Sequence, residues 1–206
     1  MNSQQVIQVT DLGAGSKNNN TSQRSVSQIT RTSAKSPKYA QLLFRLVNYF
    51  QPNVILELGT SLGITTAYLA LARQNSQVIT MEGCPNIAQQ ASQNFKNLGL
   101  KNTKIITGNL DHTLQITVNN LQHLDFVFFD GNHRYEPTIR YFQTCLPKRH
   151  VNSVFVFDDI YWSPEMEKAW KEICRHPDVH LSIDLFHLGL ILFRPHQPKQ
   201  HFTLWF

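Results

Sequence analysis

The 206-residue sequence lacks long apolar runs and contains only three cysteines. No stretch approaches the roughly 20 consecutive apolar residues of a membrane-spanning helix, so we expect no membrane partner. The amino-terminal residues contain no apolar segment typical of a signal peptide. The cysteines are odd in number and lack the spacing of metal ligands. Together these features predict reduced thiols and a cytoplasmic protein.

A dense block of basic residues is also missing. The formal net charge is +5, but the Lys and Arg residues are scattered along the chain. A scattered distribution is typical of a solvated surface, so nucleic acid is not an expected partner. The length suits one α/β domain with a buried core.

The dinucleotide-binding pattern G-x-G-x-x-G is absent too, although residues 53–72 have the order strand, Gly turn, helix. The apolar run at 54–58 predicts a buried strand, and residues 65–72 predict a helix. Between them, Gly59 permits a sharp turn and close approach of a ligand. The free N–H groups at the start of the helix suit a carboxylate or phosphate. The glycine pattern is E-x-G-x-x-x-G, from Glu57 to Gly63.

The rest of the chain alternates between strands and helices. An amphipathic helix at 38–50 begins after Ser36 and Pro37, which suit an N-cap and a first helical position. Further strands are predicted at 77–81, 103–107, 124–129, 151–157, 179–184 and 187–193. Further helices are predicted at 86–98 with Asn86 as N-cap, at 110–121, at 136–146 and after Ser163. A short connection makes the last two strands antiparallel neighbours.

Five β–α units and a closing antiparallel pair, over roughly residues 37–194, are similar to the class I S-adenosylmethionine-dependent methyltransferases. The pattern from Glu57 to Gly63 resembles the first motif of that family. The resemblance implies an α/β, Rossmann-like class I methyltransferase fold. Such a fold has a mostly parallel seven-stranded sheet, an antiparallel last strand and helices on both faces.

The resemblance implies S-adenosyl-L-methionine as the cofactor. Ligands of open α/β sheets bind beyond the carboxyl ends of the strands, where Glu82 is suited to the ribose hydroxyls; the alternative is a solvated surface glutamate. Asn109 is expected either beside the adenine or as the N-cap of the next helix. The full set of expected cofactor residues is Glu57, Gly59, Thr60, Ser61, Gly63, Glu82, Gly83, Gly108, Asn109 and Asp130.

Within this family the chain looks like the catechol-type small-molecule O-methyltransferases. In that group an Asp after the fourth strand and an Asp-Asn pair after the fifth hold Mg²⁺; here the residues are Asp130, Asp158 and Asp159. The alternative is that Asp158 caps a turn and Asp159 faces solvent. His133 stands where the group has a lysine, and we expect His133 and Asp130 to be catalytic, His133 as the general base.

The expected function is O-methylation of a small molecule, with Tyr161, Trp162, His133 and Tyr135 as candidate walls of the acceptor pocket. The alternative for each of these side chains is packing under the helix that follows. An NAD-linked oxidoreductase and a non-catalytic Rossmann-like binding protein are the alternatives. A homodimer is left open. Residues 36–206 form the expected domain and residues 1–35 a polar arm, whose abrupt start leaves open a missing helical region. The turn at Asp11–Ser16 is either part of this arm or a flap over the active site.

Overall fold

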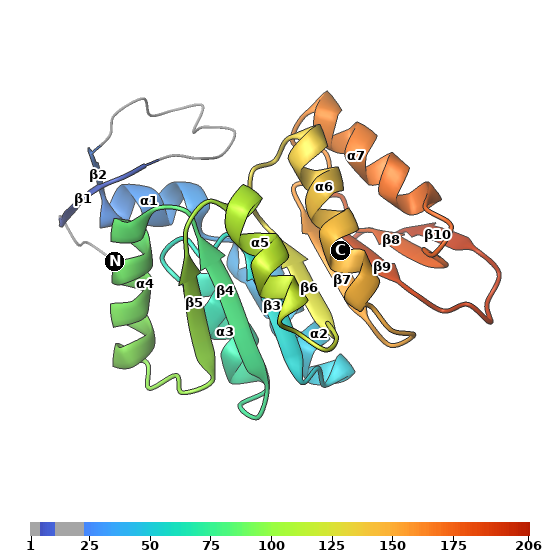
Figure 1. Cartoon of the computed structure of the whole chain (residues 1–206). Coiled ribbons are helices and arrows are strands. Elements are labelled where there is room, and N and C mark those ends of the chain that lie inside the picture. Colours follow the sequence, from blue (N-terminus) through green and yellow to red (C-terminus); the bar gives the residue numbers. More distant parts are fainter. Residues whose placement is uncertain (1–4, 11–22) are drawn as a thin grey trace. The chain divides into compact units, whose positions relative to one another are not determined.

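The computed structural model describes residues 5–10 and 23–206, so the turn predicted at Asp11–Ser16 lies outside the described residues. The chain divides into two compact units, residues 1–113 and residues 114–206. Strands and helices alternate along most of the chain, as Figure 1 shows. In the described ranges, no helix is both long enough and apolar enough to cross a membrane.

Three parallel strands form the framework of the first unit. They are β3 (Val54–Leu58), β4 (Gln77–Glu82) and β5 (Thr103–Thr107), and β4 pairs with both of the others. The chain turns from β3 into α3 (Ile64–Ala72), against which α2 (Pro37–Phe50) packs. The interior of β3 is buried, as expected of a strand covered on both faces. These elements confirm the predicted strand, turn and helix.

The helix after β4 begins earlier than predicted. Cys84 is the N-cap of α4 (Pro85–Asn97), so the expectation that Asn86 caps this helix was wrong. Pro85 is the reason, because its fixed φ favours the first helical position. Asn86 instead donates from Nδ2 to the carbonyl oxygen of Gln8 at 2.9 Å.

The amino-terminal segment contains a helix that the sequence analysis did not predict. Strands β1 (Val6–Gln8) and β2 (Gln23–Ser25) pair antiparallel, and α1 (Val26–Ser33) follows. The hydroxyl of Ser25 accepts from the Gln28 N–H at 3.2 Å, and Gln28 Oε1 accepts from the Ser25 N–H at 2.9 Å. This reciprocal pair is a capping box, which satisfies two free donors at the start of the helix.

This segment packs on the rest of the first unit through a small apolar cluster. Ile7 from β1 and Ile29 from α1 are buried against Leu62, Cys84 and Ile87. The last three side chains follow the carboxyl ends of β3 and β4. The boundary expected near residue 35 stays a prediction.

The second unit contains five strands. They are β6 (Phe126–Phe129), β7 (Val154–Asp158), β8 (Leu181–Asp184), β9 (Leu188–Leu192) and β10 (Gln200–Thr203), in the order β10-β8-β9-β7-β6. Strands β6 and β7 are parallel, and β9 is antiparallel to β7 and β8. The reversed strand of the predicted fold is therefore β9.

Strand β10 was not predicted and runs parallel to β8. All four of its residues are exposed, so the sequence has no buried alternation to mark it. Apart from the β1–β2 pair, the two units together supply eight strands, where seven were expected.

Helices and aromatic rings complete the second unit. The helices are α5 (Leu110–Asn119), which crosses the boundary between the units, α6 (Tyr135–Cys145), the 3-10 turn η1 (Leu146–Lys148) and α7 (Pro164–Arg175). Ser163 caps α7 as predicted, accepting from the Met166 N–H at 3.2 Å. The largest fully buried side chains of this unit are Phe126, Phe128, Phe142, Phe155 and Phe157.

Candidate active site

The loop between β3 and α3 turns through three residues with left-handed backbones. They are Gly59 (φ 103°), Ser61 (φ 48°) and Gly63 (φ 79°). A Cβ at Gly63 would lie 2.3 Å from Cε1 of Phe95, so both the backbone and the available space favour glycine. The sequence predicted the two glycines but not the strained Ser61, because serine has no preference that marks this conformation.

Glu57 supports this loop from inside. Its side chain is fully buried, and Oε2 accepts hydrogen bonds from the hydroxyls of Thr66 and Thr80, the latter at 2.6 Å. The Thr80 hydroxyl also lies 2.6 Å from that of Thr60. Sequence analysis missed Thr66 and Thr80, because a threonine within a helix or strand carries no motif. The predicted contacts of Glu57 and Thr60 with a cofactor stay predictions.

Glu82 joins two loops at the carboxyl end of β4. Its Oε2 accepts from the Ser61 N–H at 2.8 Å, and its Oε1 accepts from the Cys84 N–H at 2.9 Å. Glu82 and the neighbouring Gly83 are partly exposed. A carboxylate has about four acceptor positions, so one side chain can accept from several donors at once, as the two hydroxyls of a ribose require.

The loop after β5 continues the same edge of the first unit. Gly108 has φ 142°, and its N–H donates to the Glu82 carbonyl at 2.9 Å. Asn109 Oδ1 accepts from the Asp111 N–H at 2.9 Å. Of the two roles considered for Asn109, the N-cap is confirmed, and the contact with adenine stays a prediction.

Two carboxylates and one imidazole come together in the second unit. Asp130 follows β6, His133 lies three residues later, and Asp158 ends β7. Their potential ligand atoms all lie within 4.8 Å of one another. Asp158 is only 2% exposed, and the side chains of Asp130 and His133 are 13% and 23% exposed. Sequence analysis placed His133 near the acids as a base but did not predict that it belongs to their ligand group.

Asp159 lies outside this group of three. It follows the end of β7 with φ 52°, and its N–H donates to the His187 carbonyl at 2.7 Å. Strand β7 ends at Asp158, and the group of ligand atoms within 4.8 Å of one another includes Asp158 but not Asp159. The prediction that Asp159 is a metal ligand therefore gains no support from the group.

The donor set of this group is suited to a divalent cation. Two close carboxylates repel each other unless a cation or proton lies between them. Asp130 and Asp158 offer oxygen ligands, and His133 offers a nitrogen through Nε2 or Nδ1. The residues therefore fit the divalent ion that the resemblance implies.

The tyrosines expected to wall an acceptor pocket already have polar partners. Tyr161 donates to Asp184 Oδ2 at 2.5 Å, and this hydrogen bond to a carboxylate raises the pKa of Tyr161 to about 12. Tyr135 donates to Glu172 of α7, which favours packing over a free pocket wall for its ring. Trp162 stays 47% exposed. The sequence did contain a signal for the partner of Tyr161, because Asp184 is an acid at the end of a predicted strand.

The glycine-rich turn after β3, the acid at the end of β4 and the reversed strand β9 define the fold as that of a class I methyltransferase. The sequence profile of the family described as "Methyltransferase domain" matches residues 56–160, about half of the chain. The chain belongs to this family.

Two curated relatives share part of their length with the chain. Catechol O-methyltransferase of Niastella koreensis is 31% identical over 128 residues, which is 61% of this chain and 57% of the relative. Protein-L-isoaspartate O-methyltransferase of Methanococcus aeolicus is 43% identical over 56 residues, or 27% of this chain and 26% of the relative. The chain thus spans little more than half of one relative and about a quarter of the other.

Among solved structures, the O-methyltransferase TomG of Streptomyces achromogenes is similar over most of the chain. The two share 21% identity with a TM-score of 0.71, covering 81% of this chain and 86% of TomG. This similarity confirms the fold. No feature of the described residues favours an NAD-linked oxidoreductase.

Proposed function

We propose that the protein is an S-adenosylmethionine-dependent methyltransferase that methylates an oxygen of a small molecule. The observation that carries this proposal is Glu82, a partly exposed carboxylate that links the β3 and β4 loops through two backbone N–H groups. The family match and the likeness to catechol O-methyltransferase support the same reaction class. TomG, of the same fold, was crystallised with the methyl donor bound.

In this proposal the first unit binds the methyl donor. Glu82 accepts hydrogen bonds from the ribose hydroxyls, and the loop from Gly59 to Gly63 lies against the methionine part. Gly83, Gly108 and Asn109 line the adenine. Glu57 acts indirectly, because its buried carboxylate fixes the threonines beneath the loop.

The second unit holds the acceptor. In the reaction a lone pair of the acceptor oxygen attacks the methyl carbon, the bond from carbon to sulfur breaks, and S-adenosylhomocysteine leaves. The hydroxyl proton must leave as well. Asp130 and Asp158 would hold a divalent ion, which would supply Lewis-acid stabilisation of the acceptor oxygen as its proton leaves. His133, three residues beyond Asp130, would act as the general base that takes the proton, and Asp159 would be a further ligand of the ion.

We also propose a cytoplasmic location, which the three free cysteines support. Association into a homodimer stays an open expectation that sedimentation would test.

Transfer of a labelled methyl group tests the proposed function. The purified chain is incubated with methyl-labelled S-adenosylmethionine and a panel of catechols, simple phenols and carboxylic acids. We expect label in one hydroxyl acceptor, loss of transfer on adding a chelator, and recovery on adding a divalent ion. If label appeared only in the carboxylic acids, the acceptor would be a carboxylate and not the proposed hydroxyl group. Transfer that is unchanged by chelator would remove the ion from the proposal.

A further inference from the structure

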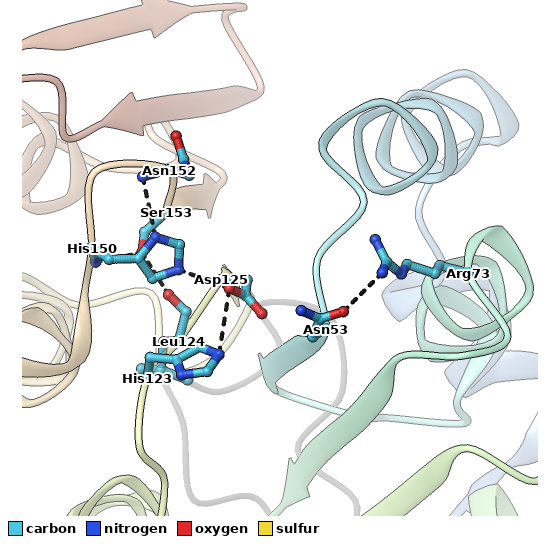
Figure 2. Close-up of polar contacts among 8 residues, drawn as sticks. All are labelled: Asn53, Arg73, His123, Leu124, Asp125, His150, Asn152 and Ser153. Atoms are coloured by element: carbon cyan, nitrogen blue, oxygen red, sulfur yellow. Dashed lines mark hydrogen bonds and ion pairs between the residues drawn. The ribbon is translucent and has the colours of Figure 1, made fainter.

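His133 faces a carboxylate at a distance that is too long for a hydrogen bond. Its Nε2 lies 3.5 Å from Asp130 Oδ1, whereas N–H···O bonds span about 2.7–3.2 Å. His150 in the same unit shows the contrast: its Nε2 lies 2.7 Å from Asp125 Oδ1, and its Nδ1 accepts from the Asn152 N–H at 3.2 Å (Figure 2). The ring of His150 is thus fixed by hydrogen bonds, and the Nε2 of His133 is not bonded to Asp130.

The spacing at His133 matches that of two ligands on one ion. Metal–ligand bonds of about 2.0–2.2 Å place neighbouring ligand atoms about 2.8–3.1 Å apart in octahedral geometry and about 3.3–3.6 Å apart in tetrahedral geometry. The 3.5 Å between Nε2 and Oδ1 falls within the tetrahedral range and is a few tenths of an ångström longer than the octahedral one. Asp158 completes a group whose ligand atoms all lie within 4.8 Å. Three ligands from the ends of two adjacent strands can therefore reach a common ion.

The backbone holds His133 in this position by an uncommon conformation. Asn132 and His133 have φ values of 68° and 26°. Such conformations persist where the surroundings enforce them, and they cluster at functional sites. In addition, Asn132 Oδ1 is buried and has no hydrogen-bond partner among the described residues, while Nδ2 of the same amide donates to the Tyr141 hydroxyl at 3.3 Å. A buried acceptor of this kind is satisfied when a polar partner is bound.

We propose that His133 binds the divalent ion through Nε2, together with Asp130 and Asp158, and that this nitrogen makes the site prefer a first-row transition ion to Mg²⁺. Mg²⁺ demands oxygen ligands, whereas imidazole suits transition ions. This inference rests on the proposed function, in which the group of Asp130, His133 and Asp158 binds an ion. If Nε2 of His133 binds the ion, that nitrogen cannot also accept the acceptor's proton, so this assignment replaces the role of general base given to His133 in the proposed function.

Binding of Mn²⁺ to the whole chain tests this assignment without any methyl donor. Pulsed electron paramagnetic resonance detects the ¹⁴N coupling of an imidazole bound to Mn²⁺, and calorimetry gives the affinities for Mn²⁺ and Mg²⁺. His133→Asn is the informative variant, because asparagine tolerates a positive φ and replaces the nitrogen ligand with an oxygen. His150→Asn is the matched control, since it removes a histidine beside a carboxylate outside the group (Figure 2).

We expect the ¹⁴N coupling in the wild type and in His150→Asn, and its loss in His133→Asn. Mn²⁺ affinity should fall at least about tenfold in His133→Asn, with a smaller effect on Mg²⁺. Binding of Mn²⁺ without nitrogen coupling, no binding of Mn²⁺, or coupling that is lost only in His150→Asn would each overturn the assignment. S-adenosylhomocysteine is titrated in parallel. If S-adenosylhomocysteine binds while the ¹⁴N coupling is absent, the ligand assignment fails and the proposed function survives. If the coupling is present but S-adenosylhomocysteine does not bind, the proposed function fails, although His133 still binds the ion.

Discussion

Among single residues, Glu82 is the one whose observed hydrogen bonds bear most directly on binding of the proposed methyl donor. Its carboxylate accepts two backbone N–H groups from separate loops. If it also accepts the ribose hydroxyls, Glu82→Ala should weaken S-adenosylhomocysteine binding by about 2–4 kcal/mol, because charge-assisted hydrogen bonds are lost. Glu82→Gln should recover part of the affinity, since one side-chain oxygen remains. Calorimetric titration measures both.

The control for Glu82 is Glu167→Ala, which removes an exposed glutamate paired with Lys171 at 2.5 Å. Its effect on binding should be negligible. An affinity of Glu82→Ala within about twofold of the wild type would mean that the ribose hydroxyls bind elsewhere. Melting curves of each variant report separately on the loss of the two backbone contacts.

Gly63 and Gly99 form a second test at this scale, because both have left-handed backbones and only one is crowded. Their φ values are 79° and 67°, but a Cβ at Gly63 would meet the Phe95 ring, whereas nothing lies within 4 Å of one at Gly99. Gly63→Ala should therefore lower the free energy of unfolding by about 1–3 kcal/mol more than Gly99→Ala. Urea unfolding of the two variants measures the difference. Equal losses in the free energy of unfolding would show that the Phe95 ring moves aside without measurable cost and that backbone strain alone destabilises both variants.

Among the elements, α1 connects the amino-terminal segment to the nucleotide-binding loops. Ile29 of α1 packs with Ile7, Leu62 and Cys84, and the Thr10 N–H lies 3.3 Å from Cys84 Sγ. Ile29→Ala should loosen this packing, since truncation of a buried isoleucine costs about 2–5 kcal/mol. Cys84 should then react faster with a thiol reagent, as peptide mass spectrometry would show.

Cys145 is the internal control for this experiment, because it is also buried but lies in α6. Its reaction rate should not change in Ile29→Ala. If both cysteines react faster, the variant has lost global stability. If neither does, α1 does not protect Cys84.

The sequence predicts elements well where burial is continuous and poorly where it is not. Strands β3, β4, β6 and β7 have apolar runs that end in Gly or acidic residues, and their positions were predicted to within a few residues. Helix α1 buries a single side chain, Ile29, and its capping box was the signal that was overlooked. Strand β10 buries none, so the contacts that hold it, backbone pairing with β8 and the Ser182–His201 side-chain contact, leave no burial pattern in the sequence.

The residues of the candidate site likewise fall into those that the sequence predicts and those that it does not. Residues such as Glu82 and Asp130 were predicted because they follow strands, and strand ends can be found in the sequence. The separation of Asp158 from Asp159, and the entry of His133 into the ligand group, depend on backbone angles at Asp159 and His133. Those angles result from tertiary packing around each loop, which a single sequence does not reveal.

Across the whole molecule, the two units have different chemistry at their strand ends. The first unit presents glycine turns around the partly exposed carboxylate of Glu82, which suit a nucleoside. The second presents the group of Asp130, His133 and Asp158, which suits a cation and an ionisable acceptor. The proposed methylation of a hydroxyl group would use both kinds of chemistry.

Calorimetric titration of the full chain with S-adenosylhomocysteine, and separately with NAD⁺, tests the central claim most directly. A class I methyltransferase should bind S-adenosylhomocysteine with a dissociation constant in the micromolar range, about −8 kcal/mol, and should give no heat with NAD⁺. Binding of NAD⁺ without binding of S-adenosylhomocysteine would contradict the proposed function.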